Sequence, residues 1–189
     1  MALLAMSLLV PLLSPRQAEA KNRAEERQEI QDKTAAELQR LYREVPEAED
    51  LIENDYGYAV LFNTGIKLGI LGSAHGRGMA VNNETGEIVY MKMEEQSAGL
   101  GLGVKEYTLY FVLTSPQAWE NFTNGKGWKG GTTASATATE KGEGGSLEVA
   151  DFESEGIIVY QLNTKGISLE ASIKGTKFYP SKDLNDYSE

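Results

Sequence analysis

The chain has 189 residues, including 20 glycines and no cysteine, and carries a formal net charge of −10 at pH 7. This length is enough for one domain with a buried core. The acidic balance argues against a general nucleic-acid-binding protein, because neutralising phosphates requires a basic surface. Without cysteine the chain has no disulfide framework, no thiol nucleophile and no thiol for lipid attachment.

The first twenty residues differ in composition from the rest of the chain. Ala2–Leu13 is almost wholly apolar, and the small residues Ala18 and Ala20 mark a cleavage site before Lys21. About a dozen apolar residues are fewer than the roughly 20 that a membrane-spanning helix needs. We therefore expect residues 1–20 to be a secretory signal peptide and the mature protein to be periplasmic or extracellular. An uncleaved anchor is the alternative.

Residues 21–55 are predicted to form an N-terminal helical segment. The first helix, Lys21–Val45, has one stripe that comprises Ile30, Thr34, Leu38, Leu41 and Val45. Pro46 ends this helix and lies at the start of a second one, which ends near Asn54. The charges on the first helix nearly balance and no Trp or Phe lines its stripe. We interpret it as a helix packed on a sheet and not as a membrane-surface segment.

The segment Gln96–Thr114 is central to the predicted fold. Its residues alternate with the period of a strand, and Gly99, Gly101 and Gly103 share one face. A straight strand from Ser97 to Leu113 would span about 55 Å, whereas the expected radius of gyration is only about 15 Å. We therefore predict an α+β, mostly β fold, in which a strongly bent antiparallel sheet or partial barrel curls at these glycines. A phosphate-binding loop is disfavoured, because strand-like residues and not a helix follow the glycines.

Residues 56–189 read as a β-rich domain that forms one unit with residues 21–55. Three hairpins are predicted: Tyr58–Phe62 with Ile66–Leu71, Gly76–Val81 with Glu87–Met93, and Ile157–Leu162 with Ile167–Ile173. Ser115 and Pro116 begin a short helix in which Trp119 and Phe122 share a buried face. Residues 124–146 are low in complexity, and Thr132–Thr139 within them could be a thin strand or part of a mobile loop.

Candidate catalytic and metal-binding residues are few. His75 is the single histidine, and neither a catalytic triad nor a His-rich metal site can be assembled around it. The carboxylate clusters do not match a calcium-binding loop. Asn83 and Asn121 begin glycosylation sequons, a pattern that is common by chance. We predict no catalytic residues, no metal site and no cofactor, and therefore a protein that is not an enzyme.

Several short motifs, in their order and spacing, resemble the SYLF lipid-binding domain family, also called the yeast-type actin-binding domain family. They are Tyr56–Val60, Lys67–Gly69, Gly76–Met79, Ser97–Gly99 with the Gly-rich strand, the helix with Ala118 and Phe122, Tyr160 with Gly166, Gly175, and Asn185 with Tyr187. The resemblance covers the chain from about residue 35 onward. One departure is Leu61-Phe62-Asn63, where the family usually has Phe-Pro.

The resemblance implies a mostly β domain without known catalytic activity. Eukaryotic members bind phosphoinositide membranes through a basic N-terminal segment, some bind actin filaments, and bacterial members are typically exported. A lipid or membrane surface is therefore the expected partner, with Lys33, Arg40, Lys67 and Arg77 as the candidate lipid-binding cations. The alternative is a structural or protein-interaction module that oligomerises through the segment around Thr132–Thr139. No nucleic-acid partner is expected.

Overall fold

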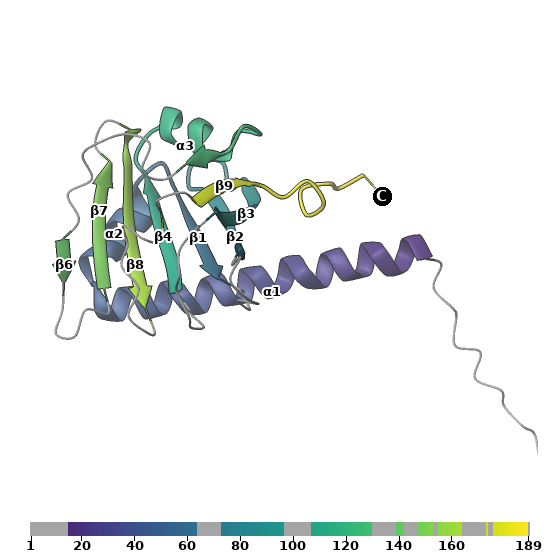
Figure 1. Ribbon diagram of the computed structural model, residues 1–189, viewed down its shortest axis with the longest axis horizontal. Coiled ribbons are helices and arrows are strands. Elements are labelled where there is room, and N and C mark those ends of the chain that lie inside the picture. The colour runs from purple at the N-terminus through teal and green to yellow at the C-terminus, as the bar shows by residue number, and fades with distance from the viewer. Residues whose placement is uncertain are drawn as a thin grey trace, which may run out of the picture.

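The computed structural model describes residues 15–63, 73–96, 107–129, 139–141, 147–152, 155–163, 173 and 176–188. Its helices are α1 (Pro15–Glu44), α2 (Glu47–Asn54) and α3 (Pro116–Thr123). Its strands are β1 (Gly57–Asn63), β2 (Ser73–Asn82), β3 (Ile88–Gln96), β4 (Tyr107–Leu113), β5 (Trp128–Lys129), β6 (Thr139–Lys141), β7 (Leu147–Phe152), β8 (Ile157–Asn163) and β9 (Thr176–Pro180). Figure 1 shows α1 running across the sheet, with α3 above it.

The strands form one antiparallel sheet in the order β5-β9-β3-β2-β1-β4-β8-β7-β6. Phe111 in β4 and Phe178 in β9 are four positions apart in this order, which in a flat sheet would separate them by about 19 Å. Their ring centroids are nevertheless 5.1 Å apart. The sheet therefore curls into a half-barrel, which confirms the predicted bent sheet. The glycines Gly99, Gly101 and Gly103, at which we placed the bend, lie outside the described residues.

Strand β4 confirms that the described part of the central segment is a strand. Both faces of β4 are covered by other elements. Tyr107, Leu109, Phe111 and Leu113 point into an aromatic core with α3, β5 and β9. Tyr110 and Val112 point to the opposite face, where they pack with α1 and α2. All seven residues of β4 are buried. Trp119 and Phe122 belong to the aromatic core, as predicted.

One predicted hairpin is confirmed and two have the wrong partner strands. Val81 in β2 pairs with Ile88 in β3 across a turn, in which the Asn82 side-chain oxygen accepts from the Glu84 and Thr85 amides at 2.9 Å. Strand β1, however, pairs along both edges, with β2 and with β4. Strand β8 likewise pairs with β4 and β7.

Neither β1 nor β8 therefore has an edge left for the partner strand that we predicted for it. Residues 66–71 and 167–172 themselves lie outside the described residues, and Ile173 is buried. The turn-forming residues after each strand were local signals, and local signals do not specify which strands become neighbours across the sheet.

Helix α1 begins at Pro15, inside the predicted signal peptide, and not at Lys21. Proline is well tolerated in the first turn of a helix. The N-terminal part of α1 extends beyond the sheet in Figure 1. The predicted stripe is buried, with Ile30, Leu41 and Val45 at most 2% exposed. This confirms that α1 packs on the sheet. Among the described residues, no helix is long and apolar enough to cross a membrane.

Candidate binding sites along helix α1

Two of the predicted lipid-binding cations line one small cavity beside α1. The cavity has a volume of about 150 Å³ and is lined by Lys33, Glu37, Arg40, Phe62, Asn63, Tyr107 and Thr108. Among the described residues, helix α1 supplies the charged groups that line it, and the ends of β1 and β4 supply the rest. These two cations and one carboxylate together carry a net charge of about +1, and we call this site the cationic cavity.

The carboxylate in the cationic cavity is held in place by its neighbours. Glu37 Oε2 accepts a hydrogen bond from the Tyr110 hydroxyl at 2.9 Å and lies 3.4 Å from Arg40 Nη1. Burial raises the pKa of Tyr110, and the Glu37 charge and hydrogen bond raise this pKa further. Tyr110 is therefore a neutral donor at ordinary pH. The Tyr110 hydroxyl and the Arg40 guanidinium both contact the Glu37 carboxylate.

Lys33 has a different environment from Arg40. Its ammonium nitrogen lies 4.1 Å from the centre of the Phe62 ring, a cation–π contact. It makes no ion pair with any residue that the structure describes. The positive charge of Lys33 is therefore the part of the cationic cavity that an anionic group could neutralise.

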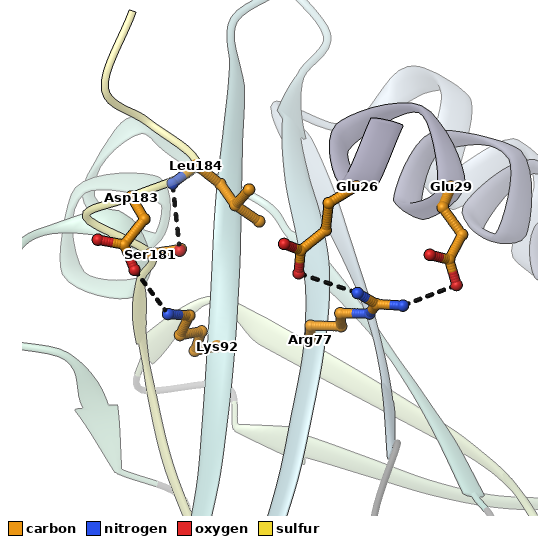
Figure 2. Close-up of polar contacts among 7 residues, drawn as sticks. All are labelled: Glu26, Glu29, Arg77, Lys92, Ser181, Asp183 and Leu184. Carbon is orange, nitrogen blue, oxygen red and sulfur yellow. Dashed lines mark hydrogen bonds and ion pairs between the residues drawn. The ribbon is translucent and has the colours of Figure 1, made fainter. Parts of the chain in front are cut away.

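Arg77, the third predicted cation, is engaged elsewhere. Its Nη1 and Nη2 atoms lie 2.9 Å from Glu26 and 2.7 Å from Glu29, two carboxylates one turn apart on α1 (Figure 2). Arg77 therefore fastens α1 to β2 and is not part of the cationic cavity. Lys67, the fourth predicted cation, lies outside the described residues.

The C-terminal segment, residues 181–188, also fastens α1 to the sheet. Arg27 on α1 donates to the backbone oxygens of Leu184 and Asp186 at 2.8 Å, and its guanidinium lies 4.2 Å from the Tyr187 ring centre. Asn185 exchanges two hydrogen bonds of 2.8 Å with the backbone of Tyr90 in β3. Figure 2 shows a further contact of this segment, between Asp183 and Lys92. The motif residues Asn185 and Tyr187 thus have structural roles.

A second, larger cavity, which we did not predict from the sequence, lies on the other side of α1. It has a volume of about 400 Å³ and is lined by Ala35, Leu38, Gln39, Tyr42, Ile52, Glu53, Tyr58 and Asn83. We call it the tyrosine groove. Its residues come from α1, α2, β1 and the turn after β2. Because these residues come from four separate elements, no motif with a fixed spacing in the sequence could have predicted the site.

The described residues offer little machinery for catalysis. They contain no group of three or more His, Asp or Glu side chains that could hold a metal ion. His75 is exposed in β2. The sequon residue Asn83 has a structural role, because its side-chain amide donates to the Ile52 and Asp55 carbonyl oxygens at 2.8 Å. The arrangement of side chains around the two cations is suited to binding.

Comparison with known proteins agrees with the motifs found in the sequence. Residues 94–187 match the family model described as "Ysc84: Las17-binding protein actin regulator". The chain is 32% identical over 151 residues to the protein named beta cell expansion factor A of Aeromonas veronii. That alignment covers 80% of this chain and 56% of the relative, so the chain spans little more than half of the relative's length. The chain therefore belongs to the Ysc84, or SYLF, domain family, whose members are non-enzymatic and associated with lipids and actin.

Proposed function

We propose that this protein is a non-enzymatic lipid- or membrane-associated binding module of the bacterial cell envelope. Family membership supports a binding role. The observation that carries the proposal is the placement of Lys33 and Arg40, which lie two helical turns apart on α1 and line the same cavity. Export to the envelope follows from the predicted signal peptide.

The cationic cavity suits a single phosphate group of a lipid headgroup. Lys33 would act as a point charge and Arg40 as a planar donor. Glu37, which Tyr110 holds at 2.9 Å, keeps Arg40 oriented. Because the apolar stripe of α1 is already buried in the core, this mode of binding needs only the headgroup to reach the cavity. It does not require α1 to leave the sheet and insert.

Vesicle flotation tests the proposal. We expect the protein to float with vesicles that contain an anionic phospholipid and to float less with pure phosphatidylcholine. The double variant Lys33→Gln, Arg40→Gln should lose this preference. The matched control is Lys21→Gln, Arg43→Gln, which removes the same charge from α1 at positions that do not line the cavity. Equal losses in both double variants, or no flotation with any composition, would contradict the proposal.

The alternative function is a structural or protein-interaction module that oligomerises. Strand β6 is the end of the sheet order and directly follows the Gly-, Thr- and Ala-rich stretch. An end strand presents unpaired backbone groups to which another chain could add. Light scattering would reveal this, since an oligomer that becomes a monomer when Thr132–Thr139 is deleted would favour the alternative. A monomer before and after the deletion would count against it.

A further inference from the structure

The tyrosine groove has the opposite electrostatic character to the cationic cavity. Among the residues that the structure describes, no lysine or arginine lines it, and the formal charge of its lining comes from Glu53 on α2. Glu53 makes no ion pair with any described residue. Burial, followed by the negative charge of Glu53, raises the pKa of Tyr42 to about 12. The Glu53 carboxylate is therefore close enough to Tyr42 to influence its hydroxyl.

Two tyrosines and two large aliphatic side chains, Leu38 and Ile52, are among the residues that line the groove. Tyr42 and Tyr58 are partly buried, and both rings pack against the core cluster that contains Leu38 and Ile52. Packing restricts both rings, so a ligand that contacts them costs little further side-chain entropy. Burial also raises the pKa of Tyr58, so both hydroxyls are neutral at ordinary pH.

The charged group that lines the groove is an acceptor, and the donors there, the Gln39 amide and the two tyrosine hydroxyls, are neutral. The side-chain NH₂ of Asn83 is used by the Ile52 and Asp55 carbonyl oxygens, which leaves the amide oxygen as its remaining group. The Glu53 carboxylate accepts only. A phosphate would find no cation here. A positively charged group with alkyl substituents would find aromatic faces, apolar contact and a carboxylate together.

We propose that the tyrosine groove is a binding site for an organic ammonium ion of the choline type. The rings of Tyr42 and Tyr58 would contact the alkylated cation, Leu38 and Ile52 would contact its methyl groups, and Glu53 would supply the opposite charge. At 100° per residue, the α1 residues of this groove (Ala35, Leu38, Gln39 and Tyr42) lie on the side of the helix opposite to Lys33, Glu37 and Arg40. The proposal is therefore independent of the proposed headgroup site.

Isothermal titration calorimetry tests it with choline chloride and with 3,3-dimethyl-1-butanol, the neutral carbon analogue of the same shape. We expect choline to bind about fivefold or more tightly than the alcohol, a ratio typical of a cation–π contribution. Glu53→Gln and Tyr42→Leu should each weaken choline binding by a similar factor. Tyr42→Phe keeps the ring and should retain binding. Glu120→Gln, an exposed carboxylate on α3, is the matched control and should change nothing.

Glu53 is exposed, so Glu53→Gln should fold normally. The test therefore remains valid even if Tyr42→Leu unfolds. Absence of choline binding, equal binding of the alcohol, or equal effects of Glu53→Gln and Glu120→Gln would overturn the proposal. The cation could belong to a lipid headgroup or to a free solute, and phosphatidylcholine vesicles distinguish these two sources. Vesicle binding that Glu53→Gln abolishes would identify a lipid headgroup, whereas binding of choline alone would identify a free solute.

Discussion

Gly78 in β2 provides the sharpest test of the packing between β1 and β2. A Cβ added at Gly78 would lie 1.9 Å from the backbone oxygen of Val60 and 2.7 Å from the Cα of Leu61. Real Cβ contacts are essentially never shorter than 3.0 Å, so in Gly78→Ala the strands must move apart by about 1.1 Å. Both obstacles are backbone atoms, and no side chain can rotate to make room.

The expected cost follows from this displacement. A shift of this size breaks one or two ladder hydrogen bonds at about 0.5–1.5 kcal/mol each and adds about 1–3 kcal/mol of overpacking strain. We expect a loss of about 3 kcal/mol in the free energy of unfolding, which lowers the melting temperature by roughly 6–12 °C.

Urea unfolding measures the free energy, with Gly125→Ala as control, because a Cβ at Gly125 has no atom within 4 Å. If the two variants agree within about 0.5 kcal/mol, our account of this strand contact is refuted.

Three further outcomes are expected. Phe111→Ala should lower the free energy of unfolding, measured with urea, by about 3–5 kcal/mol. The reason is that the Phe111 ring contacts Phe122, Trp128 and Phe178, with ring centroids at most 5.9 Å away. A decrease below about 1 kcal/mol would contradict the role of this ring in the core. Arg77→Gln should lower the free energy of unfolding by no more than about 1 kcal/mol, because the partners of Arg77 are partly exposed. This decrease should become smaller at high salt. A decrease that salt does not change would argue against a stabilising ion pair. The pKa of Tyr42 is raised from 10.0 to about 12 and that of Tyr110 is also raised, so the unfolded chain loses these protons first. The two tyrosines should therefore lower the melting temperature as the pH rises from 10 to about 12, in parallel with tyrosinate absorbance, and should not change it between pH 7 and 10. Melting that is independent of pH between 10 and about 12 would refute the burial of both hydroxyls.

The fold was most predictable where the pattern of side chains was continuous. In α1, the stripe from Ile30 to Val45 predicted the buried face. In β4, the alternation from Tyr107 to Leu113 predicted a strand, whose residues point alternately into two cores. Ser115 was also identified correctly as the N-cap of α3, where its side chain accepts from Ala118 N. Each of these features depends on residues that are close together in the sequence, so the sequence pattern was enough to predict it.

The neighbours of each strand and the sites were less predictable, because they depend on contacts between distant residues. The partners of β1 are β2 and β4, which no turn signal beside β1 could reveal. Lys33 and Arg40 were candidates as cations, but the sequence did not show that Arg77 would be bound by Glu26 and Glu29. The tyrosine groove combines Tyr42 and Tyr58 only because α1 and β1 cross.

The position of α1 explains why the two sites differ. Its buried stripe is directed at the sheet, and the two cavities open on either side of that stripe, about 180° apart around the helix axis. One side carries Lys33 and Arg40, and the other carries Tyr42 and faces Glu53. A single zwitterionic headgroup cannot occupy both, because the body of α1, about 10 Å across with its side chains, lies between them. Ligands at the two sites should therefore bind together without competing, and any coupling between them can pass through α1 or through β1, which supplies Phe62 and Asn63 to one cavity and Tyr58 to the other.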